Sequence, residues 1–457
     1  MKRRDQQSVL FEGIADKPVE MVFDQPGQSS DGGALLLRGI DRRMGLTEAM
    51  AASVRDDRQP GKVVHAMWDL VRERVYGIGC GYPDGNDAGR LASDPVMKLI
   101  CDREPFSAGD LASQPTLSRF ENKLRRADLF RMAYAVTDRV IAWHQKRPQS
   151  RKVKRITIDM DSTCDPTHGH QQMTFFNGYY DTWCYQPMIT TIQFNGEGEQ
   201  WLVAAVLRPG NAKGSLGAVS ILKRLLPRLR RGFPGARIDV RMDGGFAAPE
   251  VLESLEAEDL RYVVNMPRNC VLERRARQLM VQARRMAKET GETARVFGET
   301  RYKAGRWKEA RRVIIKAEVT VLEGREHRDN PRFVVTNHKA APEVVYGRYT
   351  ARGDMENRIK ELKLDLSFDR TSCSAFMANQ LRNLLTVAAC ILFQQMRAKV
   401  AGTASAHAQV GTLRERLVKI GVTVVESVRR ILVRGPESYP WFATWRKVAI
   451  GCGAVSG

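Results

Sequence analysis

Two aspartates stand at strand-like positions from which they could hold a metal ion. Asp161 closes the alternating run Ile156-Thr-Ile-Asp-Met-Asp, and Asp243 closes the run Arg237-Ile-Asp-Val-Arg-Met-Asp. Side chains alternate between the faces of a strand, so each carboxylate lies on the polar face where the chain leaves the sheet. If the strands are neighbours, a hard divalent cation is the natural neutraliser of the two charges. Turn chemistry explains one such aspartate, but two in matching contexts favour a site.

A third carboxylate is expected from a helix near residue 350. At about 100° per residue, one narrow stripe of that helix contains Tyr349, Arg352, Glu356 and Lys363. An apolar stripe runs beside it and contains Met355, Ile359, Leu362 and Leu366. The helix is therefore expected to pack on other elements and to present Glu356 at the margin of the packed face. The plainer interpretation is a solvated face on which Arg352 and Glu356 form an ion pair.

Other polar residues near the first aspartate are less specific. Asp159 lies on the same strand face as Asp161, and spacing alone does not decide which of the two binds metal. His168 and His170 could join Asp165 in a metal site, but no third nitrogen or sulfur ligand follows at zinc spacing. We interpret both histidines as loop or DNA-contact residues.

The composition indicates a nucleic-acid partner. The chain has 73 Lys and Arg against 52 Asp and Glu in 457 residues, a net charge of +21, and 43% of its residues are hydrophobic. The hydrophobic content excludes a disordered chain, and the charge attracts polyanions through counterion release. The eight cysteines are isolated from one another and are expected to be free thiols. No apolar stretch of about 20 residues and no signal segment is apparent, so we expect a cytoplasmic protein without membrane contact.

Helical periodicity dominates residues 1–150 and predicts a helical N-terminal domain, to which we assign DNA binding. Helix-period stretches run from Lys62 to Tyr76 and from Leu124 to Trp143. Between them, the segment 111–123 has the pattern of a short helix, a proline-containing break and a second helix that exposes Arg119 to DNA. A helix-turn-helix reader of DNA is one interpretation, and an ordinary pair of packed helices is the other.

Alternating patterns after residue 150 predict an α/β fold. Strands are expected near 156–161, 186–194, 200–207, 237–243 and 260–265, and helices near 217–231 and 251–258. The first three strands form an antiparallel meander, and helical crossovers then add parallel strands, which gives a mixed sheet flanked by helices. This order of elements is the one found in ribonuclease-H-like folds.

Changes in residue composition and hydrophobic pattern divide the chain after residue 150 into further parts. Residues 151–265 are the first part of the catalytic domain, and 266–340 are predicted to form a basic, β-rich insertion before the helix that carries Glu356. The catalytic domain is completed by 341–400, and 401–457 are predicted to be a C-terminal helical region.

Two groups of aromatic residues are candidates for contacts with bases. Trp307 stands among basic residues, including Arg306, and is predicted to stack on DNA bases. Tyr179, Tyr180 and Trp183 form a second cluster that could stack on unpaired bases, but we expect these rings to pack under the neighbouring hairpin.

Several motifs resemble those of a known family. The spacing Tyr-x2-Arg-x3-Glu-x6-Lys from Tyr349 to Lys363 resembles the signature of a large branch of bacterial insertion-sequence transposases of the Asp-Asp-Glu (DDE) class. The segments Asp161-Ser-Thr and Arg241-Met-Asp-Gly-Gly-Phe resemble the two aspartate motifs of that branch. The likeness extends from about residue 20 to about residue 400.

The resemblance implies a function and a set of site residues. Asp161, Asp243 and Glu356 would hold two Mg²⁺ or Mn²⁺ ions, and two such ions support phosphodiester hydrolysis and strand transfer. The enzyme would cut double-stranded DNA at the terminal inverted repeats, free 3′-hydroxyls and join them to target DNA, with Tyr349, Arg352 and Lys363 on the phosphates.

The setting implied by the family is the bacterial cytoplasm at the nucleoid, with a homodimer on DNA. One alternative keeps the fold as a metal-dependent nuclease that does not join DNA. Another is a catalytically silent DNA-binding repressor.

Overall fold

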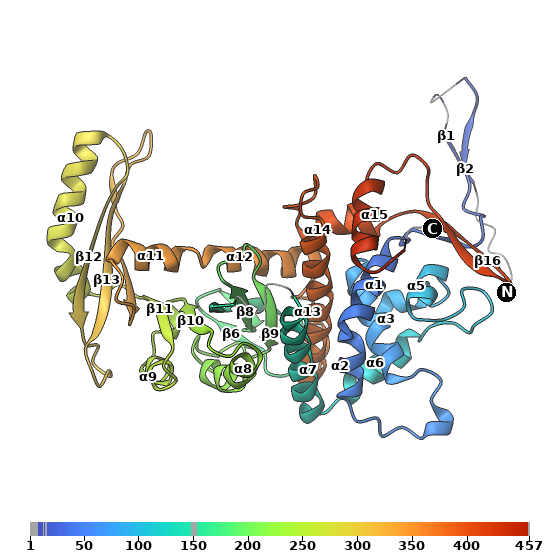
Figure 1. The fold of residues 1–457 in the computed structure, drawn as a ribbon, viewed down its shortest axis with the longest axis horizontal. Helices are drawn as coiled ribbons and strands as arrows, with labels where there is room; N and C mark the ends of the chain where they lie inside the picture. Colours follow the sequence, from blue (N-terminus) through green and yellow to red (C-terminus); the bar gives the residue numbers. More distant parts are fainter. Residues whose placement is uncertain (1–7, 12, 14–15, 148–152, 456–457) are drawn as a thin grey trace.

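The computed structural model describes residues 8–11, 13, 16–147 and 153–455. Figure 1 shows an elongated molecule with a sheet at its centre, a group of helices at one end and a helix-covered extension of the sheet at the other. A helical rod crosses the top of the sheet and leads into one long helix beside the N-terminal helices.

The N-terminal part is mainly helical, as the periodicity predicts. Its helices are α1 (Ala34–Met44), α2 (Leu46–Ala52), α3 (Met67–Gly79), α4 (Ala88–Leu91), α5 (Pro95–Ile100), α6 (Gln114–Lys123) and α7 (Arg126–Gln145). Short strands precede them: β1 (Val9–Phe11), β2 (Val19–Met21) and β3 (Gln28–Ser29). Single turns of 3-10 helix lie at Pro60–Lys62 and Gly85–Asp87.

The first of the two helices predicted within 111–123, whether as a helix-turn-helix or as a packed pair, is absent. Residues 111–113 form no helix, and α6 begins at Gln114 with Pro115 in its first turn. Proline is tolerated there because the first N–H groups of a helix have no intrahelical partner. The proline therefore starts the only helix of this segment instead of separating two.

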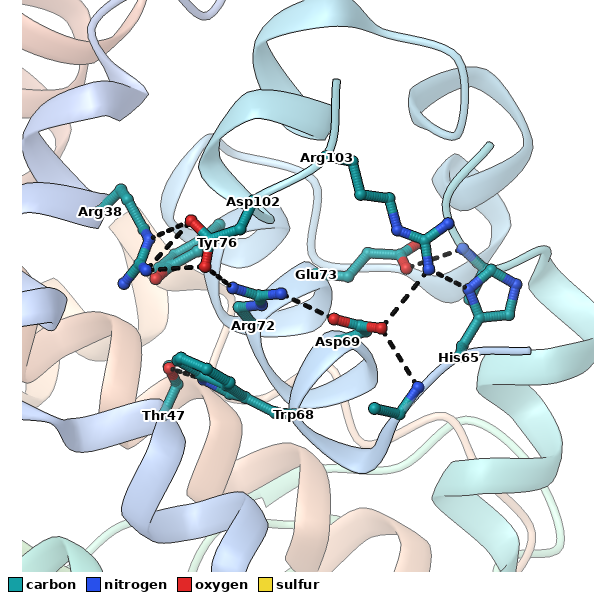
Figure 2. A network of polar contacts seen from close by, with 12 residues as sticks. Arg38, Thr47, His65, Trp68, Asp69, Arg72, Glu73, Tyr76, Asp102 and Arg103 are labelled. Atoms are coloured by element: carbon teal, nitrogen blue, oxygen red, sulfur yellow. Dashed lines mark hydrogen bonds and ion pairs between the residues drawn. The ribbon is translucent and has the colours of Figure 1, made fainter. Parts of the chain in front are cut away.

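Charged side chains cross-link the N-terminal helices (Figure 2). The Arg72 guanidinium donates to Asp69 at 2.7 Å, pairs with Asp102, and lies 4.4 Å above the ring of Trp68. The Trp68 indole in turn donates to the Thr47 hydroxyl at 2.9 Å. These contacts join α2, α3 and the end of α5, so the helical part is held by paired charges as well as by apolar packing.

The central sheet has the strand order β12-β13-β15-β11-β10-β4-β8-β9, in which β12 is Ala294–Tyr302, β13 is Arg311–Thr320 and β15 is Arg332–Thr336. Its predicted core consists of β4 (Arg155–Ser162), β8 (Met188–Phe194), β9 (Trp201–Val206), β10 (Arg237–Met242) and β11 (Arg261–Met266). Strands β4, β8 and β9 pair antiparallel, whereas β10 is parallel to β4 and β11 is parallel to β10. The predicted mixed sheet, with a meander followed by parallel strands, is confirmed. Helices α8 (Ala218–Gly232) and α9 (Pro249–Ala257) make the crossovers.

A buried ion pair joins β4 and β10 and fixes their register. Asp159 lies opposite Arg241 in the parallel ladder, and the guanidinium donates to both carboxylate oxygens, at 2.7 and 2.6 Å. Gln200 donates to the same carboxylate at 3.2 Å. Because neighbouring strands are about 4.8 Å apart, the residues two positions further along, Asp161 and Asp243, leave the sheet side by side.

The strands predicted for 266–340 extend the same sheet. Helix α10 (Cys270–Thr290) is followed by β12 (Ala294–Tyr302), β13 (Arg311–Thr320), β14 (Arg328–Asp329) and β15 (Arg332–Thr336). Strand β15 pairs antiparallel with both β11 and β13. The block is therefore continuous with the central sheet, and α10 covers its β12–β13 part (Figure 1).

The rod above the sheet leads into the principal core helix. It consists of α11 (Pro342–Thr350), α12 (Gly353–Lys360) and a π-helical turn, η5 (Glu361–Asp365). Helix α13 (Phe376–Lys399) follows and packs on α3, α1 and α7 as well as on β9. By length and apolar character α13 would suffice to cross a membrane, but 83% of its most apolar window is buried within the fold, as in a core helix.

The predicted domain divisions do not correspond to separate cores. Helix α13 joins the N-terminal helices to the sheet, and α7 packs on β9 and α8. One contiguous cluster of buried apolar residues includes both parts. The boundary predicted at 150–151 itself lies outside the described residues.

The C-terminal region is not purely helical, contrary to the prediction. It contains α14 (Val410–Leu413), a π-helical turn at Arg414–Val418, β16 (Val422–Ser427), β17 (Arg430–Arg434) and α15 (Phe442–Gly451). Strand β16 pairs with β17 and with β3 near the start of the chain. Alternate burial of Val422 and Val424 gives this segment the period of a half-buried strand.

We predict that Asp159→Ala destabilises the protein by about 3–5 kcal/mol, because it leaves the buried Arg241 charge without a partner. Urea unfolding monitored by circular dichroism measures the change. The exposed pair of Arg284 and Asp329 supplies the control, since Asp329→Ala is expected to cost about 1 kcal/mol or less. Equal losses in the two variants would contradict the structural role given to Asp159.

Candidate active site

Asp161 and Asp243 form the centre of the site, as the alternating patterns predict. Asp161 is the penultimate residue of β4 and is buried. Asp243 follows β10 directly, and its carboxylate accepts from the backbone N–H of Gly245 at 3.0 Å. This contact caps the single 3-10 turn Gly244–Phe246, so the chain turns away and leaves the carboxylate at the end of the sheet.

Burial raises the pKa values of both aspartates, and repulsion adds to the rise at Asp161. The pKa of Asp161 is raised to about 7, first by burial and further by the negative charges of Asp243 and Glu356, while Arg352 opposes the rise. Burial also raises the pKa of Asp243, opposed by Arg352, by the Gly245 N–H and by Arg208. The third predicted carboxylate is therefore within electrostatic range of the first.

Arg352 is the cation of this cluster. One of its terminal nitrogens lies 2.5 Å from a carboxylate oxygen of Asp161, and the other lies 3.7 Å from Glu356. Its side chain is buried, yet its pKa is raised because the surrounding acidic groups outweigh the effect of burial. Tyr349 belongs to the same cluster: burial raises its pKa, and the charges of Asp161 and Asp243 add to the rise.

Glu356 lies at the edge of the packed face, as predicted from the two stripes. Its side chain is 62% exposed, whereas Met355 and Ile359 on the neighbouring stripe are buried. Buried and half-buried ion pairs behind α12 hold the helix in place. They join Arg358 to Glu361 and Glu199, and Arg397 to the same two glutamates.

Lys363 lies in the π-helical turn that follows α12. Its ammonium donates to the backbone carbonyl of Cys164 at 2.8 Å and lies 3.9 Å from the carboxylate of Asp369. It therefore ties the helix to the loop after Asp161. A contact of Lys363 with phosphate stays a prediction.

The donors suit a hard divalent cation, although the described conformation does not enclose one. Within the described ranges, no three His, Cys, Asp or Glu side chains are close enough together to hold a metal ion. Asp161 and Asp243 nevertheless provide oxygen donors with raised pKa values at the end of the sheet, and the third carboxylate of the predicted set, Glu356, is exposed on α12. In the described conformation the positive charge beside Asp161 comes from the Arg352 guanidinium.

The structure distinguishes the two aspartates of β4. Asp159 is fully buried, and its carboxylate accepts hydrogen bonds from Arg241 and Gln200. Asp161, two residues nearer the strand end, is the one beside Asp243. His168 and His170 instead line a separate polar pocket with Asp369 and Arg370.

Two residues predicted to contact DNA lie away from the carboxylates. Arg119 is exposed on α6, which Figure 1 places on the opposite side of α13 from β10. Trp307 is only 3% exposed: its ring packs edge-to-face on Tyr302, and the Arg311 guanidinium lies 5.1 Å above it. The prediction that Trp307 stacks on bases is therefore wrong for this conformation, because the β12–β13 hairpin closes over the ring.

The other aromatic prediction errs in the opposite direction. The sequence predicts that Tyr179, Tyr180 and Trp183 pack under a hairpin, but all three rings are exposed. They stand on a small sheet of their own next to β4 and β8.

Arg208 is a site residue that the sequence patterns do not reveal. It is buried, and its guanidinium donates to the Ser162 hydroxyl at 2.6 Å and to three backbone carbonyls of the loop 213–216. Burial lowers its pKa to about 10, opposed by the charges of Asp243 and Tyr180. A single arginine after a strand carries no distinctive spacing, so only its contacts identify it.

Comparisons with known proteins identify the family of the chain. A family model described as "Transposase DDE domain group 1" matches residues 11–450, and the chain therefore belongs to this family of transposases. No curated protein sequence matches the chain.

Solved structures give weaker similarities. The piggyBac transposase synaptic complex with hairpin DNA has 11% identity and a TM-score of 0.43, over 86% of this chain and 82% of that chain. Endonuclease V from Ciona intestinalis, in complex with a 23mer DNA containing an inosine followed by a ribo-adenosine, has 14% identity and a TM-score of 0.24, over 47% of this chain and 88% of that chain.

The raised pKa of Asp161 predicts a pH dependence of stability. A carboxyl group with a higher pKa in the folded state binds more protons there than when unfolded, so its contribution falls as pH rises from about 4 to about 7. Between pH 5 and 7, the wild type should lose on the order of 2 kcal/mol relative to Asp161→Asn. Urea unfolding of both proteins across this range measures the difference, and a constant difference would contradict the raised pKa.

Proposed function

We propose that this protein is a DNA transposase that cuts element ends and joins them to target DNA. The observation that supports the proposal is the convergence of Asp161, Asp243 and Glu356 around Arg352 in a chain of the DDE transposase family. The central strand order supports a ribonuclease-H-like catalytic core: β9-β8-β4-β10-β11, with the meander antiparallel and the last strands parallel.

The cofactor in this proposal is a pair of Mg²⁺ or Mn²⁺ ions held by Asp161, Asp243 and Glu356. Such ions activate an attacking oxygen and neutralise a leaving oxygen of a phosphodiester. Three carboxylates contribute a charge of about −3 against +4 from two ions, which leaves net positive charge for a phosphate. Binding requires Glu356 to turn toward the aspartates, and its exposed side chain has room to do so.

The chain's own basic residues position the DNA. Arg352 now pairs with Asp161; with that carboxylate bound to a cation, the guanidinium would be available for a phosphate oxygen beside the cut, with Tyr349 next to it. Lys363 holds the loop that follows Asp161 and adds positive charge on the same side. These residues orient the strand, while the carboxylates serve the reacting phosphate.

The biological setting belongs to the same proposal. The Tyr-Arg-Glu-Lys spacing supports an insertion-sequence enzyme of bacteria, acting in the cytoplasm at the nucleoid on terminal inverted repeats and target DNA. Joining two ends in one reaction calls for two active sites, so a homodimer on DNA is the proposed assembly.

We predict that Asp161→Asn, Asp243→Asn and Glu356→Gln each lower Mg²⁺-dependent cleavage at least about 100-fold, because each removes a negatively charged oxygen donor. The substrate is linear DNA that carries the sequences flanking the reading frame. Binding of the same DNA is measured by gel shift and should change less than about threefold. Glu343→Gln, an exposed glutamate of α11, is the matched control and should keep full cleavage.

The products of that assay separate the alternatives. Transfer of a cut 3′ end into a second DNA is the expected result, detected as joined products by sequencing. Cutting without joined products would instead identify a metal-dependent nuclease. Binding without any cutting in Mg²⁺ or Mn²⁺ would identify a repressor.

Metal binding should release protons near neutral pH. At pH 6.5 a substantial fraction of Asp161 is protonated, and Mg²⁺ must displace that proton to bind the carboxylate. Calorimetry in two buffers of different ionisation enthalpy measures the released protons. We expect fewer in Asp161→Asn and an unchanged number in Glu343→Gln; no binding heat in the wild type would contradict the metal assignment.

A further inference from the structure

A small sheet beside the carboxylates presents aromatic rings to solvent. It consists of β5 (Asp165–Pro166), β7 (Thr182–Tyr185) and β6 (Phe175–Asn177), in that order. The exposed rings are Phe175, Phe176, Tyr179, Tyr180 and Trp183, which we call the aromatic hairpin. Tyr179 is 87% exposed and Trp183 is 55% exposed. Contiguous exposed apolar surface of this kind marks a binding site on a soluble protein.

The rings are arranged in two ordered pairs. Phe176 and Trp183 are cross-strand partners, and their ring centroids are 6.3 Å apart in an edge-to-face contact. Tyr179 and Tyr180 form a second edge-to-face pair at 4.8 Å. Mutual packing of this type limits the freedom of the side chains, so little entropy is lost when a ligand binds.

The loop of the aromatic hairpin is fixed to the body of the protein. The Asn177 side-chain amide donates to the carbonyl of Gly210 at 2.8 Å, and the carboxamide oxygen accepts from the Tyr179 N–H at 3.0 Å. A Cβ atom at Gly210 would overlap the carbonyl oxygen of Cys184, so only glycine permits this close approach. The rings are therefore held in place before any ligand binds.

The aromatic hairpin adjoins the carboxylates. Strand β7 leads directly into β8, and β8 pairs with β4 up to Ser162, the residue after Asp161. Burial raises the pKa of Tyr180 to about 12, and the charges of Asp161 and Asp243 contribute to the rise. The phenol is thus within electrostatic range of both aspartates.

We propose that the aromatic hairpin stacks on unpaired nucleobases next to the phosphodiester that the carboxylates cut. Stacking needs an open face of a base, and in an intact duplex those faces are covered by neighbouring bases. Every base offers such a face, so the contact holds the strand without selecting a sequence. The net charge of +21 supplies attraction for the strand itself. This inference rests on the proposed function, because it uses the position of the cut.

Binding of two defined oligonucleotides tests the proposal. One is a forked DNA, a duplex with a single-stranded arm, and the other is a fully paired duplex containing the same sequence. Both are titrated with the full chain in EDTA, so that no cutting occurs. Trp183→Ala and Tyr179→Ala should each weaken binding of the forked DNA at least about fivefold and leave binding of the paired duplex within about twofold. Trp183→Phe should retain most of the affinity.

Two controls accompany these variants. Phe442→Ala removes an exposed ring of α15 and should leave both affinities unchanged. Photocrosslinking from 5-iodouracil in the single-stranded arm should join the DNA to residues 175–183, and mass spectrometry locates the crosslink. Thermal unfolding confirms that the variants remain folded.

Three outcomes would overturn the inference. Equal weakening of both DNAs would show a general electrostatic or structural effect, and unchanged binding with crosslinks elsewhere would remove the hairpin from the DNA path. A change of oligomeric state in Trp183→Ala, with DNA binding intact, would identify a second copy of the chain as the partner. Cleavage by Asp161→Asn would contradict the proposed function instead and leave these binding results standing.

Discussion

The buried ion pair of Asp159 with Arg241 is the interaction on which the geometry of the site depends. It spans two parallel strands at directly opposite positions and satisfies its remaining acceptor through Gln200. A slip of one residue would place an aspartate against an apolar neighbour and bury an unpaired charge, at a cost of several kcal/mol. With the register fixed, Asp161 and Asp243 leave the sheet together.

That arrangement concentrates negative charge, and the rest of the site compensates for it. Arg352 reaches Asp161 from the helical rod, while Arg208 approaches Asp243 from the loop after β9. Neither cation is sufficient to return the pKa of either aspartate to its ordinary value. The two aspartates would therefore be stabilised in their charged form by further positive charge. They lie within electrostatic range of Tyr180 in the aromatic hairpin.

The rod that carries Glu356 is positioned from behind by the core. Its apolar stripe packs inward, and two glutamates, Glu199 and Glu361, bind both Arg358 and Arg397. Arg397 belongs to α13, which also packs on the N-terminal helices. Through α13 the N-terminal helices and the carboxylates share one core, so a displacement of either part acts on the other.

The alternating and helical periods of the sequence predicted the central strands, the strand-end positions of both aspartates and the margin position of Glu356, because these follow from local geometry. That β4 and β10 are neighbours, so that the two aspartates leave the sheet side by side, was decided by the tertiary structure. The sequence also predicted that Tyr349 and Arg352 lie together on one helical stripe, and both belong to the cluster although a turn at 351–352 separates α11 from α12. The sequence did not predict the position of Lys363 correctly. Lys363 lies inside a π-helical turn, where successive residues no longer follow the step of about 100° assumed for an α-helix.

For side chains outside the periodic strands and helices, only the tertiary structure decided which are buried and which are exposed. Trp307 lies in a basic segment, yet Tyr302 and Arg311 cover it from across a hairpin. Tyr179 and Trp183 lie in an aromatic segment and remain open, because their small sheet has no layer packed on that face. Local composition records the character of a residue, whereas its exposure depends on chain segments that are distant in sequence and meet only in the folded protein.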